Sequence, residues 1–457
     1  MQRFKQLLSS IDMTEGKPWK KLFLFTLPLM VGTLFQQLFS TVDAIMLGTF
    51  VGDYALAAVG SSMPLFFLIM VLMMGIAMGA GIMVSQYFGA QRREELSHTI
   101  GTCITLTTML GLVIMMVGPF LTRPLLVLLN TPPEILGDSA IYMNVMFWGV
   151  LGMGYFNILS GVLRALGDAF SPLLYIALAS LLSIALNFLF IGVWGWGVMG
   201  AAISTVISQL ITSALCLRRL LQMRSVFDMG IFYLRPKKQY VVQALKLGVP
   251  AGATQAMFAL AMIVVQPLAN SFGPLFLAAH VIVIRVDGFI MTPIFSFGNA
   301  ATVYAGQNIG ADRLDRIGLG VKHGAMMGLA VTAIMTGLIL IFGRNIAGLF
   351  TQTEEVVVMS IQFIRILVPG FLALVVNMVL WGTIRGAGDA LTPMWGAIIN
   401  TVVIRVPVAY LLVHLMGRPE ALMYSLLIAW TTNMTIAAIA YRMGRWRNKS
   451  IVKPRLV

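Results

Sequence analysis

Apolar stretches recur along nearly the whole chain, and each is long enough (about 18 residues or more) to cross the ~30 Å hydrocarbon core of a bilayer. Of the 457 residues, 59% are hydrophobic and only 11% are charged, whereas about 25% of the residues in a soluble domain are charged. This pattern predicts an all-α polytopic membrane protein. Its twelve expected transmembrane helices span residues 22–50, 54–88, 96–118, 137–163, 172–192, 198–217, 246–271, 276–306, 317–341, 356–383, 393–414 and 421–441.

Basic residues are distributed unevenly among the connecting segments. The net charge of +14 would suit a nucleic-acid-binding protein, but 25 of the 31 Lys and Arg residues fall in alternate segments, starting with the one before the first helix. Such an excess marks the cytoplasmic side of a membrane protein. We therefore expect an integral protein of the plasma (inner) membrane with both termini in the cytoplasm and no nucleic-acid partner.

Two motifs occur twice at the same offset. RALGDAFSP (164–172) matches RGAGDALTP (385–393), and QYFGAQR (86–92) matches QNIGADR (307–313), each 221 residues apart. Six expected helices separate the copies, so two six-helix halves enter the membrane in the same direction as parallel repeats. In each RxxGD turn we expect Gly to permit the reversal, Asp to cap the next helix and Pro to open it. The predicted ranges are a cytoplasmic N-terminal segment (1–21), a first lobe (22–217), a basic linker (218–245), a second lobe (246–441) and a basic tail (442–457).

A carboxylate inside a membrane span is costly, so Asp43 in the first helix is a functional candidate. Asp43 and Asn187 lie about 30 Å and 22 Å along helices that both start inside, and therefore at a similar outer depth. Ser183 is one turn before Asn187, and Thr205 begins at the outer side. These four residues could form one polar pocket that holds Na⁺ or takes up a proton. The second half has Val265 and Val408 at the positions of Asp43 and Asn187.

The second half has its own ionisable residues within expected spans. Asp287 could pair with Arg365 or Arg405 across the bundle, which is the interpretation we favour; a proton-binding or substrate-binding carboxylate is the alternative. Arg285, Gln36 and Gln255 are further candidates for contacts with a substrate or with another helix. The two cysteines, Cys103 and Cys216, indicate no disulfide framework and no zinc site.

The stretch LPLMVGTLFQQLFSTVDAIMLG (27–48) resembles the first-helix signature of multidrug and toxic compound extrusion (MATE) transporters, and the repeated turns resemble that family's turns. The resemblance implies a V-shaped bundle that exports cationic or amphipathic compounds in exchange for Na⁺ or H⁺. It implies that Asp43 is the cation-binding aspartate, that Asn187 belongs to the same site, and that Ser183 replaces a frequent Asn. Thr205 matches a sixth-helix hydroxyl approximately. One branch of the family carries a Glu in the seventh helix, and the nearest position in this chain is Phe258. Asp287 matches members that carry an acidic residue in the eighth helix.

Two other functions are compatible with a chain of this kind. A lipid-linked precursor flippase of the same superfamily is the closest alternative, although such proteins tend to have more basic cavities. An enzyme is not expected, because the chain has no HExxH, GxSxG or Walker motif. We therefore predict a monomeric secondary active multidrug antiporter that works by alternating access. Its expected partners are the lipid bilayer and amphipathic small molecules, and it needs no cofactor other than its coupling ion, H⁺ or Na⁺.

Overall fold

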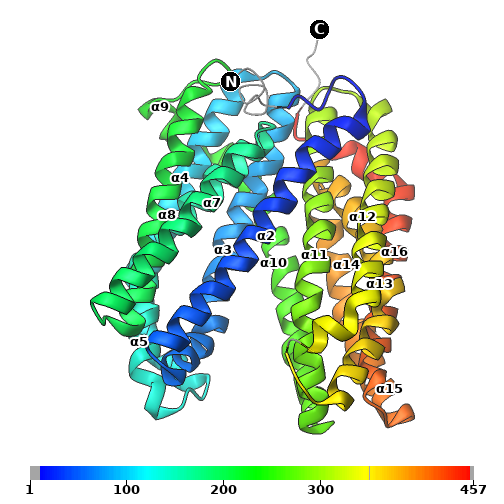
Figure 1. The fold of residues 1–457 in the computed structure, drawn as a ribbon. Helices are drawn as coiled ribbons and strands as arrows, with labels where there is room; N and C mark the ends of the chain where they lie inside the picture. Colours follow the sequence, from blue (N-terminus) through cyan, green and yellow to red (C-terminus); the bar gives the residue numbers. More distant parts are fainter. Residues whose placement is uncertain (1–10, 349, 453–457) are drawn as a thin grey trace. The chain divides into compact units, whose positions relative to one another are not determined.

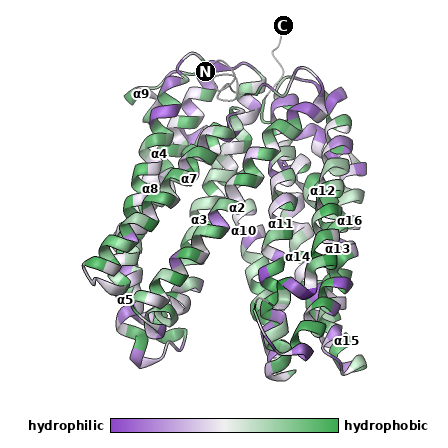
Figure 2. Cartoon of the chain, in the orientation of Figure 1, coloured by the Kyte–Doolittle hydropathy of each residue, from purple (hydrophilic) through white to green (hydrophobic). Residues whose placement is uncertain are grey.

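The computed structural model describes residues 11–348 and 350–452, which form helices and no strand. Eleven helices in this part of the chain are long and apolar enough to cross a membrane, and the count becomes twelve when one bent pair is taken as a single span. The predicted class, an all-α polytopic membrane protein with twelve spans, is confirmed. Hydrophobic residues make up most of the length of these helices (Figure 2).

The chain divides into two compact units. Unit 1 comprises Leu27–Gly252 with the chain up to Asp12, and unit 2 comprises Met13–Thr26 and Ala253–Val457. The boundaries fall inside two long helices, α2 (Pro18–Phe50) and α10 (Lys238–Asn270) (Figure 1). The units therefore differ from the predicted lobes, whose boundaries lie between helices.

Unit 1 holds most of α2 and the helices that follow it. Its core forms where Leu65, Met73, Ile114, Met143 and Phe147 pack together. The helices are α3 (Asp53–Gly89), α4 (Arg93–Leu128), α5 (Pro133–Trp148), α6 (Val150–Ala165), α7 (Phe170–Asn187), the π-helix η1 (Phe188–Val193), α8 (Gly197–Gln222) and the short α9 (Ile231–Leu234).

The fourth expected span, 137–163, is two helices rather than one. α5 and α6 meet at Gly149 with a bend of 51°. A Cβ at Gly149 would lie 2.1 Å from a methyl carbon of Val206 on α8. Glycine is therefore required by close packing against α8, which a local hydropathy pattern cannot show.

Both RxxGD turns have the predicted construction. Gly167 and Gly388 adopt φ values of +89° and +97°, which only glycine takes up readily. Asp168 accepts hydrogen bonds from the backbone N–H and the hydroxyl of Ser171, at 2.9 and 2.8 Å. Asp389 accepts the equivalent pair from Thr392, at 3.1 and 2.7 Å. The capping role predicted for the two aspartates is confirmed.

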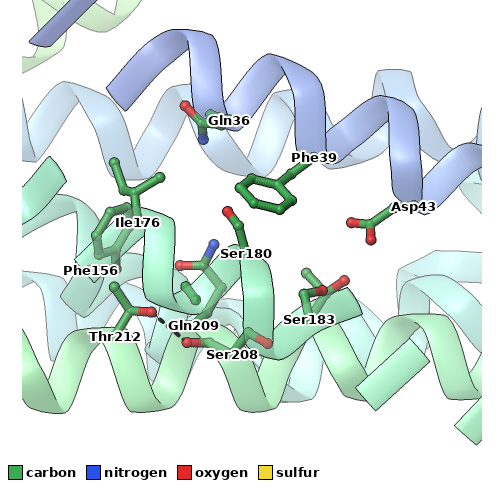
Figure 3. Close-up of a pocket in the computed structure, with 12 residues that line it drawn as sticks. Gln36, Phe39, Asp43, Phe156, Ile176, Ser180, Ser183, Ser208, Gln209 and Thr212 are labelled. Carbon is green, nitrogen blue, oxygen red and sulfur yellow. Dashed lines mark hydrogen bonds between the residues drawn. The ribbon is translucent and has the colours of Figure 1, made fainter. Parts of the chain in front are cut away.

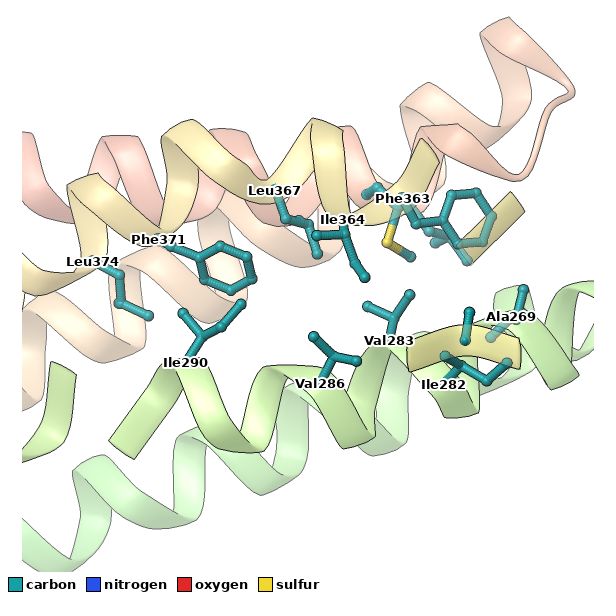
Figure 4. Packing of buried hydrophobic residues seen from close by; sticks show 14 of the residues in the cluster. Ala269, Ile282, Val283, Val286, Ile290, Phe363, Ile364, Leu367, Phe371 and Leu374 are labelled. Atoms are coloured by element: carbon teal, nitrogen blue, oxygen red, sulfur yellow. The ribbon is translucent and has the colours of Figure 1, made fainter. Parts of the chain in front are cut away.

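Unit 2 is organised around α11 (Gly273–Gly310) and α13 (Glu354–Gly386), which pack along their length. Ile282, Val286 and Ile290 on α11 face Leu367 and Phe371 on α13 (Figure 4). The remaining elements are α12 (Leu314–Gly348), α14 (Leu391–Ile398), the π-helix η2 (Ile399–Arg405), α15 (Val406–Met416), α16 (Glu420–Met443) and the 3₁₀-helix η3 (Arg445–Asn448).

The segment before α2 is ordered where the structure describes it. Within unit 2, the Met13 N–H donates to Gln307 Oε1 over 2.9 Å, and Asn308 Nδ2 donates to the Met13 carbonyl over 3.1 Å. Arg316 Nη2 donates to the Gly16 carbonyl over 2.8 Å. Gln307 and Asn308 belong to the repeated QNIGADR motif, so this motif binds a chain segment as well as forming a turn.

Candidate functional site

Asp43 on α2 is hydrogen-bonded to Asn187 on α7. Asn187 Nδ2 donates to Asp43 Oδ1 over 2.8 Å, and the Ser204 hydroxyl on α8 donates to Asn187 Oδ1. Asn187 and Ser204 are buried, whereas Asp43 is half-buried. Three helices of unit 1 therefore contribute one residue each to a carboxylate–amide–hydroxyl chain. The amide orients the carboxylate, and the hydroxyl orients the amide.

The backbone is irregular next to Asn187. This residue is the last of α7, and the chain continues directly into the π-helix η1. π-Helical turns are rare and occur frequently at functional sites, because the wider turn re-aims the side chains around it. The sequence predicted a continuous helix over 172–192, and nothing in its apolar pattern indicates the π-helical turn.

Asp43 lies at the wall of a cavity within unit 1. The cavity volume is about 150 Å³ (Figure 3). Its walls come mainly from α2, α7 and α8, with one contribution from α6. The lining residues are Gln36, Phe39, Asp43, Phe156, Ile176, Ala179, Ser180, Ser183, Thr205, Ser208, Gln209 and Thr212.

The cavity has one charged group and several neutral polar groups. Gln36 is seven residues before Asp43, about 10 Å away along α2. The Ser208 hydroxyl and Gln209 Oε1 are buried and have no hydrogen-bond partner within the described part of the chain. Buried polar groups usually have partners, so these two are available to a bound molecule or to water. Phe39, Phe156 and Ile176 supply apolar surface between them.

The polar residues predicted to meet in the first half do lie close together, but one of their expected contacts is absent. Asp43, Ser183, Thr205 and Gln36 all line the cavity, and Asn187 bonds to Asp43. The Thr205 hydroxyl, however, donates to the Ala201 carbonyl over 3.0 Å. The hydroxyl that donates to Asn187 Oδ1 belongs to the preceding residue, Ser204.

Sequence reasoning missed that neighbour, Ser204, and also Ser208, Gln209 and Thr212. The last three lie at steps of three and four residues after Thr205, which places them on one helix face. This spacing is the signal that could have found them. No comparable signal separates Ser204 from Thr205, because the rotation of α8 decides which hydroxyl faces α7.

The candidates of the second half are not gathered in one site. Arg285 and Arg365 are exposed and Gln255 is half-buried. Asp287 Oδ1 and Arg405 Nε are buried without a hydrogen-bond partner among the described residues.

The ion pair expected for Asp287 is wrong for this structure. No salt bridge joins Asp287 to Arg365 or Arg405, although all three belong to described parts of unit 2. Arg365 is exposed on α13, and Arg405 is the last residue of η2. Residue type and depth suggested the pairing, but they do not determine which way each helix turns its side chains.

No group of three or more His, Cys, Asp and Glu residues that could hold a metal ion occurs in residues 11–348 and 350–452. A Na⁺ at Asp43 and Asn187 would instead need one carboxylate with neutral oxygens. In the second half, Val265 packs against the hydrophobic core where Asp43 would have its equivalent. The carboxylate site therefore belongs to one half alone.

Comparisons with known proteins identify the family. The MatE family model matches residues 28–189 and 250–411, one copy in each sequence half. This chain belongs to the MatE family. MatE proteins are membrane transporters, so the chain is an integral membrane transporter, and the predicted family is confirmed.

Several MatE relatives are similar to this chain over nearly its full length. "Probable multidrug resistance protein YoeA" of Bacillus subtilis is 29% identical over 461 residues, which cover 97% of this chain and 98% of the relative. "Probable multidrug resistance protein NorM" of Thermotoga maritima is 23% identical, covering 98% and 97%.

Solved transporter structures have the same fold. An outward-facing multidrug resistance MATE transporter of the MOP superfamily superimposes with a TM-score of 0.90 at 23% identity, covering 95% of this chain and 98% of that one. A MOP superfamily transporter from Pyrococcus furiosus gives a TM-score of 0.89 at 24% identity, with the same coverage.

Proposed function

We propose that this MatE protein is a secondary active multidrug antiporter that exports cationic or amphipathic molecules in exchange for H⁺ or Na⁺. The observation that carries the proposal is the Asp43 carboxylate at the wall of the unit 1 cavity, hydrogen-bonded to Asn187. The names of the relatives YoeA and NorM, both described as multidrug resistance proteins, support the same class of substrate.

The cavity suits a ligand with one cationic group and an apolar body. Asp43 attracts a cation, and Phe39, Phe156 and Ile176 accept aromatic or aliphatic surface. Pockets with mostly apolar walls and few polar groups bind many different amphiphiles. The unpartnered Gln209 and Ser208 add hydrogen-bonding capacity without fixing one shape of ligand.

Exchange follows from competition for a single charge. Proton or Na⁺ binding at Asp43 removes the net negative charge from the cavity, so a cationic substrate loses its electrostatic attraction and leaves. When the ion departs, Asn187 Nδ2 stabilises the bare carboxylate through the 2.8 Å hydrogen bond. Ion and substrate therefore exclude one another, which is the requirement for antiport.

A transport assay with purified protein tests the proposal. Proteoliposomes would contain the natural chain, Asp43→Asn or Asp138→Asn, where Asp138 is an exposed aspartate of α5 and serves as a matched control. A fluorescent organic cation is followed under a pH gradient alone or a Na⁺ gradient alone. We expect one gradient to drive uphill transport by the natural chain and by Asp138→Asn, and not by Asp43→Asn. Normal uphill transport by Asp43→Asn would disprove the role of this carboxylate.

The lipid-linked precursor flippase is less well supported as an alternative. Such a substrate carries phosphate, which Arg and Lys side chains bind. None of the described residues that line the unit 1 cavity is Arg or Lys. We further propose that the protein acts as a monomer in the plasma (inner) membrane. The distribution of basic residues supports a cytoplasmic position for both termini.

A further inference from the structure

Residues 225–237, which form most of the connection between α8 and α10, are bound to the side of α4 within unit 1. Arg93 Nη2 forms an ion pair with Asp228 Oδ1 at 2.7 Å, and the Asp228 N–H donates to the Ser97 hydroxyl over 2.8 Å. Further along, the Thr105 hydroxyl donates to the Leu234 carbonyl over 2.6 Å. The segment is therefore attached to α4 at several levels.

His98 fixes the middle of this segment. Its buried ring lies against the rings of Tyr233 and Tyr240, with centroids 4.8 and 5.7 Å away. Lys237 Nζ is 2.7 Å from His98 Nε2. At Gly101 an added Cβ would lie 2.1 Å from the Tyr233 carbonyl oxygen, so the segment passes directly over the α4 backbone. The linker predicted from its charge is thus a docked element with a fixed register.

The contacts give the depth of the segment relative to α4. Its chain meets Ser97 at Asp228, reaches Thr105 at Leu234 and returns to His98 at Lys237. Ser97 and Thr105 are eight residues apart, or about 12 Å along the helix axis. The segment therefore extends about two turns past the polar start of α4, toward the part of the helix that is apolar.

Between its contacts with Ser97 and Thr105 the segment presents large apolar side chains. Ile231 and Phe232 of α9 are 81% and 62% exposed. Figure 1 shows α9 at the periphery of unit 1. Helices that lie in a membrane interface bury such residues about 5–10 Å into the boundary between headgroups and acyl chains. This part of unit 1 therefore carries side chains of the kind that an interfacial position buries.

Basic side chains flank the apolar pair. Arg224, Arg235 and Lys238 are exposed, and none forms an ion pair with any described residue. The nearby Asp228 is already paired with Arg93. The protein surface around Ile231 and Phe232 therefore carries positive charge that is not neutralised by an ion pair. Such a surface complements an anionic partner better than a basic or a neutral partner.

We propose that residues 224–238 form an interfacial anchor that inserts Ile231 and Phe232 into the bilayer and binds the headgroup of an anionic phospholipid through Arg235 and Lys238. The anchor would hold α4, and with it unit 1, at a fixed depth at this face of the membrane. This role is separate from ion and drug exchange at Asp43.

Quenching in nanodiscs tests the apolar part of the proposal. The natural cysteines, Cys103 and Cys216, are buried, so a fluorophore attached to Ile231→Cys reports on that position alone. The references are labels at Leu338→Cys, an exposed apolar position of α12, and at Glu355→Cys, an exposed polar position of α13. We expect brominated phosphatidylcholine to quench the label at 231 as it does at 338. Iodide should quench only the label at 355.

Lipid retention tests the charged part. The protein is reconstituted in phosphatidylcholine nanodiscs that contain added phosphatidylglycerol. It is then released from the discs, and native mass spectrometry measures how much phosphatidylglycerol stays bound to it. Each basic residue near an anionic surface is worth about 1 kcal/mol, so Arg235→Gln/Lys238→Gln should lower the affinity for phosphatidylglycerol about 30-fold. The control Lys322→Gln/Lys449→Gln removes two exposed charges from unit 2 and should leave the affinity unchanged.

Three outcomes contradict the anchor. The first is iodide quenching at position 231 equal to that at 355. The second is unchanged retention of phosphatidylglycerol by Arg235→Gln/Lys238→Gln with an unaltered melting temperature. The third is displacement of the lipid by inorganic phosphate at equal concentration, which would indicate a site for free anions.

Discussion

Asn187 donates a hydrogen bond to Asp43 over 2.8 Å, across 144 residues of sequence. The contact joins the C-terminal parts of α2 and α7 and leaves Asn187 Oδ1 to accept a hydrogen bond from the Ser204 hydroxyl. The Asn187 amide holds the Asp43 carboxylate in place, and an ion bound at Asp43 would replace this donor. The following predictions depend on this arrangement and on three others in the structure.

Asn187→Ala should slow coupled transport while the protein still folds. The variant removes a hydrogen bond to a charged group, worth about 1.5–3 kcal/mol, so the expected loss is about tenfold to hundredfold in initial rate. Ser180→Ala, which changes the same cavity wall outside the hydrogen-bonded chain, should change the rate less than threefold or so. Equal losses in the two variants, measured in proteoliposomes, would argue against a special role for the Asn187–Asp43 contact.

The two RxxGD turns should differ in their contribution to stability. Asp168 accepts a hydrogen bond from Arg219 Nε at 2.8 Å in addition to its capping bonds, whereas Asp389 has no ion pair with any described residue. Asp168→Ala removes a hydrogen bond to a charged group, worth about 1.5–3 kcal/mol, in addition to the cap, while Asp389→Ala should cost about 1 kcal/mol, as for a lost cap.

Thermal unfolding in detergent measures both single variants. Asp168→Ala/Arg219→Ala should cost less than the sum of Asp168→Ala and Arg219→Ala measured singly, because both single variants remove the same ion pair. A larger effect at Asp389 than at Asp168 would show that the ion pair does not stabilise the first turn.

Asp287 and Arg405 should behave independently. Because no ion pair joins them, the stability changes of Asp287→Asn and Arg405→Gln should add in the double variant to within about 0.5 kcal/mol. Asp287 Oδ1 is buried without a partner, so Asp287→Asn should not destabilise the protein by the 3–5 kcal/mol or so expected for a broken buried pair. Melting temperatures of the two single variants and the double variant provide the measurement, and a coupling energy above that limit would restore the ion-pair interpretation.

Docking of the segment 225–237 on α4 should weaken in acid. The Arg93 guanidinium beside Asp228 lowers the pKa of this carboxyl below its ordinary value of 3.8. Because the pKa of Asp228 is lowered in the folded state, the ion pair stabilises docking at pH values above 3.8. This stabilisation is lost as the pH falls through the folded-state pKa. Hydrogen exchange at residues 226–234 should therefore accelerate below pH 3.8 relative to exchange in α4 itself.

The control for this pH dependence is Asp228→Asn, which should show the faster exchange already at neutral pH and little further change in acid. An acid response that persists in Asp228→Asn would assign the titration to another group.

The sequence alone determined the membrane class, the twelve spans and the repeat. Each of these depends on local composition, since any stretch that is apolar over the bilayer thickness must become a helix there. The RxxGD turns were predictable for the same reason: Gly167 and Gly388 meet a backbone requirement, and Asp168 and Asp389 cap the next helix three residues on. The rarity of intramembrane carboxylates likewise pointed to Asp43.

Only the tertiary structure decided which side chains meet. It paired Asn187 with Ser204 rather than Thr205, separated Asp287 from Arg405, bent the fourth span at Gly149 and docked the basic linker on α4. Each outcome depends on the rotation of one helix against another, and a rotation of one residue, about 100°, exchanges one facing side chain for the next. This rotation angle cannot be predicted from composition and depth, because it is set by side-chain packing over the whole interface between two helices.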